Sequence, residues 1–142
     1  MKAERQRLAR LQRLQRIRAI AKQSAAADAA RAEGTLSQLL ALADRTRALA
    51  ADYGVQEGAM TGAALRRVTE FAGGLQSIAA TTSGDAEAAR GVADDKLVLL
   101  SSAERRRAAV EQRAERQARR IARAAETPAL GSRTALGTSL EE

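Results

Sequence analysis

The sequence predicts an all-α fold, a long antiparallel coiled-coil hairpin of two helices, and three observations predict it. First, 35 of the 142 residues are Ala and only 29 are larger apolar residues, which suits a narrow seam between two helices rather than a wide core. Second, one Phe, one Tyr and five Val supply too few of the side chains that strands favour. Third, the helix-forming residues Ala, Leu, Arg, Glu and Gln dominate, with a single Pro.

The first helix is predicted over about 3–53, where the chain has no Pro and a single Gly. Apolar or small residues recur there at alternating spacings of three and four, a heptad pattern typical of a helix that pairs with one partner helix. The series consists of Leu11, Leu14, Ala21, Ala25, Ala32, Leu39, Leu42, Leu49 and Tyr53, with Arg18, Asp28, Thr35 and Thr46 interrupting it.

An apolar stripe at the start of the chain departs from this pattern. Its residues are Leu8, Leu11, Leu14, Ile17 and Ile20. Because they are spaced strictly by three, the stripe winds slowly around the helix and shows apolar surface on more than one side.

Residues 54–61 are predicted to connect the two helices. Gly54 is placed to end the first helix in the left-handed conformation that costs Gly little. Thr61 is placed to cap the start of the second helix. Because the connector is short, the two helices are expected to run antiparallel.

The second helix is predicted over about 62–126. Its apolar series is Leu65, Val68, Phe71 or Ala72, Leu75, Ile78 or Ala79, and then Leu97, Leu100, Ala103, Arg107, Val110, Ala114, Gln117, Ile121 and Ala124. Glycines at 73–74 and 84 weaken this helix by about 1 kcal/mol each relative to Ala, which leaves a second break near 81–84 open. Pro128 cannot donate a backbone hydrogen bond, so we expect the helical domain to span 1–126 and the tail, 127–142, to be disordered.

The positive charge is concentrated in two basic segments that flank a mildly acidic middle. The net charge is +7 over 1–22 and +4 over 104–126, and it is −3 over 23–103. Folding at 54–61 brings the two basic segments together, where they repel each other unless an acidic partner binds. Arginine suits carboxylates on a protein or phosphates on nucleic acid. The absence of interleaved aromatic residues and the presence of Glu111 and Glu115 favour the protein.

The residue types exclude most catalytic chemistry. The chain has no Cys and no His, so thiolate catalysis, imidazole acid–base chemistry and most zinc sites are not expected. The carboxylate pairs 94–95 and 141–142 are adjacent in sequence and do not face each other on a helix. We therefore predict a non-enzyme without a cofactor or metal. No apolar run approaches 18 residues, and the basic N-terminus lacks the apolar region of a signal peptide, so a cytoplasmic protein without membrane insertion is expected.

Three segments resemble FliJ-type flagellar export proteins. The opening, Leu8-Ala-Arg-Leu11-Gln-Arg-Leu14-Gln-Arg-Ile17-Arg, is similar to the start of that family. So are the middle, Met60-Thr-Gly-Ala-Ala-Leu65 leading to Phe71 and Leu75, and the Arg-rich end that begins Glu104-Arg-Arg-Arg. The resemblance covers about residues 8–126.

This resemblance implies a non-enzymatic coiled coil similar to the stalk subunit of rotary ATPases. Its basic end would sit in the hexameric ring of an export ATPase and promote assembly and hydrolysis, at the cytoplasmic face of the membrane at the flagellar base. The residues implied for the ring are Leu8, Leu11, Arg13, Leu14, Arg16, Ile17, Arg18, Arg116, Arg119, Arg120 and Arg123. Family members also contact the membrane export gate and handle export chaperones, and the positions that match the family's gate-binding spacing are Phe71, Leu75, Ile78 and Thr82.

The same residues also allow purely structural explanations and other functions. The stripe that contains Phe71 can be coiled-coil seam, and most single arginines can be part of a solvated surface. The alternative function is a basic coiled coil that associates with nucleic acid, and a third is a structural scaffold. The related stalk proteins of virulence secretion systems fit the sequence equally well.

Overall fold

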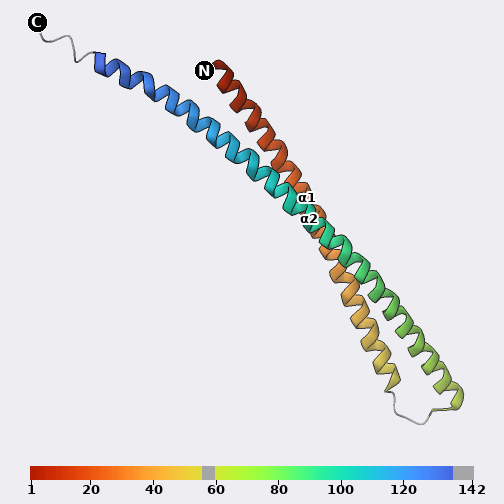
Figure 1. The fold of residues 1–142 in the computed structure, drawn as a ribbon. Coiled ribbons are helices and arrows are strands. Elements are labelled where there is room, and N and C mark those ends of the chain that lie inside the picture. The colour runs from red at the N-terminus through yellow and green to blue at the C-terminus, as the bar shows by residue number, and fades with distance from the viewer. Residues whose placement is uncertain (56–59, 136–142) are drawn as a thin grey trace, which may run out of the picture. The chain divides into compact units, whose positions relative to one another are not determined.

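The computed structural model describes the backbone of residues 1–55 and 60–135, and the side chains of residues 1–55 and 60–126. Two long helices, α1 (Lys2–Gly54) and α2 (Gly62–Ala135), pack against each other as a helical hairpin, and helix accounts for 97% of what is described (Figure 1). No strand occurs in these residues. The predicted all-α hairpin is therefore confirmed, and each helix begins within one residue of its predicted start.

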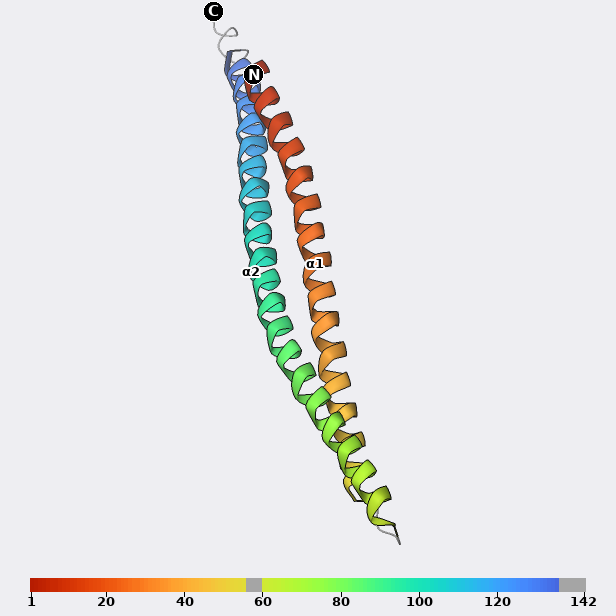
Figure 2. The ribbon, with the colours of Figure 1, turned by 90° about the vertical axis from the view of Figure 1, so that its right-hand side faces the viewer.

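The chain divides into two compact units, each containing part of both helices. Unit 1 combines Met1–Ser24 with the part of α2 from Ser101 onward, and unit 2 consists of Ala25–Leu100. Within each unit, α1 and α2 run alongside each other (Figure 2).

The connector has one of its two predicted caps. The backbone N–H of Ala64 donates to Thr61 Oγ1 at 3.2 Å, and the N–H of Leu65 donates to the Thr61 carbonyl at 3.0 Å, so Thr61 caps α2 as predicted. The left-handed conformation predicted for Gly54 is wrong, because Gly54 is the last residue of α1 and no described glycine has a positive φ. Of the connector itself, residues 56–59 lie outside the described part.

The predicted end of the second helix is also wrong. Helix α2 continues through Pro128 to Ala135, and it has no break at 73–74 or 81–84. Proline removes one backbone donor without forbidding the helix, and the alanines around it favour the helix strongly. Near 81–84 the seam residues Ala79, Thr82 and Ala86 are buried against α1, and this packing offsets the cost of the glycines. The remainder of the predicted tail, 136–142, lies outside the described residues.

The seam between the helices follows one heptad register on each helix. Every residue in this register is buried or half-buried. On α1 the seam consists of Glu4, Leu8, Leu11, Gln15, Arg18, Lys22, Ala25, Ala29, Ala32, Leu36, Leu39, Ala43, Thr46, Ala50 and Tyr53. On α2 it consists of Val68, Ala72, Leu75, Ala79, Thr82, Ala86, Ala89, Ala93, Lys96, Leu100, Ala103, Arg107, Val110, Ala114, Gln117 and Ile121.

Four of the nine predicted seam residues of α1 lie one position away from the observed seam. Leu42 and Leu49 are 48% and 44% exposed, whereas the neighbouring Ala43 and Ala50 are each 2% exposed. Small side chains occupy the centre because they let the two helices approach, and the leucines cover the edge of the seam. On α2 the predicted series from Leu100 to Ile121 is confirmed residue by residue.

The displaced register gives the first testable prediction. Ala43→Leu adds bulk to a filled seam and should lower the free energy of unfolding by about 1–3 kcal/mol. Leu42→Ala removes a half-exposed side chain and should cost less than about 1.5 kcal/mol. Urea unfolding followed by circular dichroism measures both, and a larger loss for Leu42→Ala would assign Leu42 to the seam.

Candidate functional site

Two flanks border the seam, and each combines residues of both helices. With the seam residues labelled a and d of the heptad, the residues beside them occupy positions e and g. In unit 2, Arg47 Nη2 donates to Ser83 Oγ at 3.1 Å, and both residues occupy e. The e positions of the two helices therefore share one side, the e flank, and the g positions share the opposite side, the g flank.

The g flank of unit 2 is mainly apolar, with Asp28, Thr35 and Asp85 as its polar members. Six large side chains on it are 44% to 56% exposed. They are Leu42, Leu49, Phe71, Ile78, Val92 and Leu99. The Phe71 ring also contacts Tyr53 edge to face, with ring centroids 4.9 Å apart. The e flank of unit 2 is mostly polar, with Glu33, Arg47, Thr69, Gln76, Ser83 and Arg90 beside Leu40 and Leu97.

The four residues predicted for the export gate do not form one exposed face. Phe71 and Ile78 are exposed on the g flank, at 49% and 54%. Leu75 is half-buried in the seam. Thr82 is 7% exposed, and its hydroxyl donates to the Ile78 carbonyl at 2.9 Å. The spacing predicted for this face alternates between g and d positions, so only its g residues are available to a partner.

The g flank of unit 1 is basic. Arg7 of α1 and Arg113, Arg116 and Arg120 of α2 line a groove of about 540 Å³ whose other lining residues are Leu11 and Gln117. A second hollow of about 300 Å³ is lined by arginines alone, at positions 116, 119, 120 and 123. None of the described residues that line either hollow is acidic.

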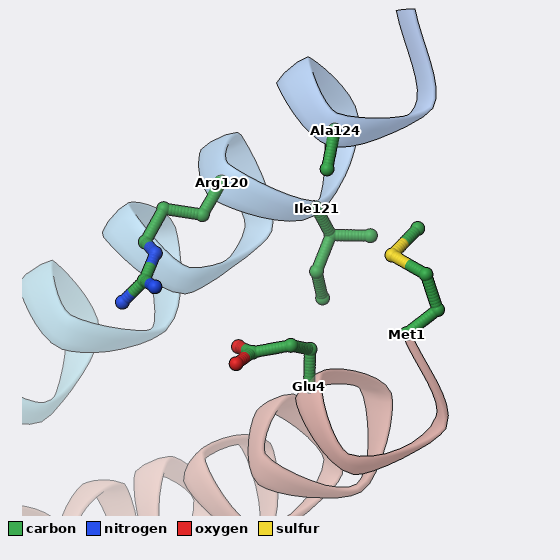
Figure 3. Close-up of a pocket in the computed structure, with 5 residues that line it drawn as sticks. All are labelled: Met1, Glu4, Arg120, Ile121 and Ala124. Carbon is green, nitrogen blue, oxygen red and sulfur yellow. The ribbon is translucent and has the colours of Figure 1, made fainter. Parts of the chain in front are cut away.

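A small pocket adjoins this basic flank. Met1 and Glu4 extend from the start of the chain toward Ile121 and Arg120 of α2, with Ala124 beside them, around a volume of about 160 Å³ (Figure 3). Gln117 Nε2 donates to the Glu4 carboxylate and, at 3.4 Å, to the Glu4 carbonyl. This hydrogen bond, with the nearby charges of Arg120 and Arg7, holds the pKa of Glu4 below its usual value.

The seam of unit 1 contains a chain of ion pairs. Lys22 Nζ lies 2.8 Å from Glu104 Oε2, which joins α1 to α2. Arg107 donates to Glu104 at 2.9 Å and to Glu111 at 3.0 Å. The hydrogen bonds from Arg107 and Lys22 lower the pKa of Glu104 from 4.5 to about 2. Arg18, on the α1 side of this seam, keeps its Nε atom buried without a hydrogen-bond partner among the described residues.

The residues predicted for the ATPase ring are distributed over several sides of unit 1. Leu8, Leu11 and Arg18 are half-buried in the seam, and Leu14 is half-buried on the g flank. Ile17 and Ile20 are 60% and 67% exposed on the outer side of α1, so the stripe winds around the helix as predicted. Arg13 and Arg16 are exposed beside them, and the structure brings Leu11 together with Arg116 and Arg120 at the basic groove.

Several contributors to these surfaces were missed by sequence reasoning. Leu42 and Leu49 were assigned to the seam and instead lie on the apolar flank. Arg7 and Arg113 were not assigned to the ring set and line the basic groove. The signal that could have found all four is the position of the alanines. A seam centred on Ala43 and Ala50 puts residues 7, 42 and 49 of α1 at g, and a seam centred on Ala86 and Ala114 puts residue 113 of α2 at g.

No family model, curated protein or solved structure matches this chain. Neither helix has, over its described residues, a stretch long and apolar enough to cross a membrane. The described side chains also contain no group of three or more acidic residues placed to hold a metal ion.

The ion pairs of Glu104 predict that the stability of the fold depends on pH in the acidic range. Because the pKa of Glu104 is lower in the folded chain than its ordinary value of 4.5, its ionised form stabilises the fold above that pH, and this contribution is lost as the pH falls toward about 2. Glu104→Gln should therefore flatten the fall of melting temperature between pH 4.5 and about 2. The exposed Glu70→Gln is the control, and an equal flattening in both variants would contradict the assignment.

Proposed function

We propose that this chain is a non-enzymatic stalk of a flagellar-type export apparatus. It inserts into and activates a hexameric export ATPase and contacts the membrane export gate, at the cytoplasmic face of the membrane. The observation that carries the proposal is the surface of unit 1, which combines the exposed Ile17 and Ile20 on α1 with a row of arginines on α2. A protein ring with an apolar lining and an acidic rim offers partners for both kinds of side chain. The resemblance to FliJ-type proteins points to the same ring.

The gate and chaperone contacts belong to the same proposal. The apolar g flank of unit 2 supports a gate contact through Phe71 and Ile78, extended by Leu42 and Leu49. Exposed apolar side chains gathered on one flank mark an interaction surface more often than scattered ones do. Export chaperones are further candidate partners of this surface.

Association with nucleic acid is the second candidate. The net charge of +7 and the isoelectric point near 11.1 favour it. Against it, the only aromatic residues, Tyr53 and Phe71, belong to unit 2 and are absent from the basic surface on which bases would stack. The exposed isoleucines of unit 1 gain little from a phosphate backbone, so the ATPase is the stronger candidate.

ATP hydrolysis by the cognate export ATPase tests the proposal directly. Wild-type protein should stimulate it, and Ile17→Ala with Ile20→Ala should raise the half-maximal stimulating concentration at least about tenfold, because each well-buried aliphatic side chain contributes roughly 1.5–3 kcal/mol. Leu97→Ala with Val98→Ala, an exposed pair in unit 2, is the matched control. Absence of stimulation by the wild-type protein would overturn the proposal, and full stimulation by the isoleucine variant would remove the apolar contact from it.

Binding to the cytoplasmic part of the export gate tests the second contact. Ile78→Asp places a charge on the apolar flank and should weaken binding at least about tenfold, since a charge buried at an interface without a partner is costly. Leu97→Asp is the control, because Leu97 is 44% exposed on the same helix but lies on the e flank. Surface plasmon resonance measures both affinities. An equal loss of gate binding in the two variants would show that the gate does not bind the g flank in preference to the e flank.

A further inference from the structure

The basic groove of unit 1 is organised as a ladder. Arg113, Arg116 and Arg120 follow one another at spacings of three and four residues on α2, and Arg7 approaches from α1. At a rise of 1.5 Å per residue, the three arginines of α2 are separated along the helix axis by steps of about 4.5 and 6 Å. Leu11 of α1, which is half-buried, provides an apolar patch in the groove between Arg7 and the arginines of α2.

The carboxylates of unit 1 that pair with seam residues lie on its e flank, and none of the described g positions of unit 1 holds a carboxylate. Glu104 and Glu111 occupy e positions and pair with Lys22 and Arg107 of the seam. Among the described residues, Arg7, Arg113 and Arg120 on the g flank form no ion pair within 4.0 Å. Like charges held side by side destabilise the helix pair, so this flank gains most from an anionic partner.

We infer that the g flank of unit 1 binds one acidic amphipathic helix of a partner protein, which lies along the groove as a third helix. Its carboxylates, repeated at spacings of three and four, would meet Arg7, Arg113, Arg116 and Arg120, and an apolar side chain of the same helix would cover Leu11. The inference rests on the proposed function and narrows it, because it names one flank and one kind of partner segment.

The spacing of the ladder favours a helix. Carboxylates at i, i+3 and i+7 of a partner helix repeat with the same steps as the three arginines of α2, so each guanidinium meets one carboxylate. A carboxylate is already held beside this groove: Gln117, which lines the groove, donates a hydrogen bond to Glu4, and this bond, together with the nearby charges of Arg120 and Arg7, lowers the pKa of Glu4. The apolar patch at Leu11 suits the mixed surface of an amphipathic helix better than a phosphate backbone.

Two matched charge-reversal variants test the flank. The groove variant combines Arg7→Glu, Arg113→Glu and Arg120→Glu. The control variant combines Lys2→Glu, Arg5→Glu and Arg105→Glu, which are exposed residues of unit 1 away from the groove. Both variants change the net charge equally, so any difference between them reports position rather than total charge. Circular dichroism checks that both remain helical.

Two synthetic peptides of about 20 residues, long enough to form helix in water, serve as probes. Both contain the same Ala, Glu and Leu residues. In one peptide the glutamates and leucines share a face at spacings of three and four, and in the other the order is scrambled. Fluorescence anisotropy near 150 mM salt, where exposed charges are largely screened beyond about 8 Å, compares their affinities.

The wild-type protein should bind the one-faced peptide at least about tenfold more tightly than the scrambled peptide. The groove variant should lose this preference and the control variant should keep it. Equal binding of the two peptides, or equal loss in the two variants, would overturn the inference. So would tighter binding of single-stranded DNA than of the one-faced peptide, with loss of that binding in the groove variant, since it would assign the groove to nucleic acid.

ATPase stimulation by the same variants separates this inference from the proposed function. Stimulation that survives in the control variant and falls at least about tenfold in the groove variant supports both. Peptide selectivity without any stimulation by the wild-type protein would overturn the proposed function alone. Stimulation by the wild-type protein that is equally retained in both variants would overturn the assignment of the groove and leave the stalk function intact.

Discussion

The close packing of small side chains in the seam is the constraint on which the remaining features of the hairpin depend. In unit 2 the buried centre consists mainly of alanines, with Thr46 and Thr82 between them. Among the described residues no large side chain is fully buried. Where the helices meet through alanines such as Ala43, Ala50 and Ala79, no room is left for a larger side chain, so Leu42, Leu49 and Ile78 lie on the flank. The apolar surface of unit 2 is therefore a direct consequence of its seam.

The seam of unit 1 is polar at its centre, and this difference fixes the register of the helices there. Lys22 and Arg107 occupy seam positions that would otherwise bury apolar area, and both pair with Glu104 at the edge of the seam. Polar seam residues generally contribute little stability, but they penalise alternative registers in which their charges would be unpaired. The register matters for the site, because it decides that Arg7 of α1 faces Arg113 and Arg120 of α2 across the groove.

Much of the fold was predictable because long helices leave strong local signals. The start of α2 followed from the side-chain oxygen of Thr61, and its seam from Leu100 to Ile121 followed from heptad spacing. The register of α1 was not predictable in the same way. In an alanine-rich helix, the heptad pattern can be drawn with either Leu42 or Ala43 as the seam residue. Only packing against α2 decides that the smaller residue, Ala43, is buried in the seam. The basic residues were likewise visible in the sequence, whereas the gathering of Arg7, Arg113 and Arg120 on one flank depends on contacts between the two helices.

The two units therefore present different chemistry at the same heptad position. On α2 the g positions hold Phe71, Ile78 and Val92 in unit 2, and Arg106, Arg113 and Arg120 in unit 1. An apolar surface gains from dehydration, which depends little on salt, whereas an arginine surface gains from charge, which salt screens. A partner surface of one uniform chemistry cannot satisfy both the g flank of unit 1 and the g flank of unit 2. The arrangement suits two partners of different chemistry, one apolar and one acidic, which is the division of contacts that the proposed stalk would need.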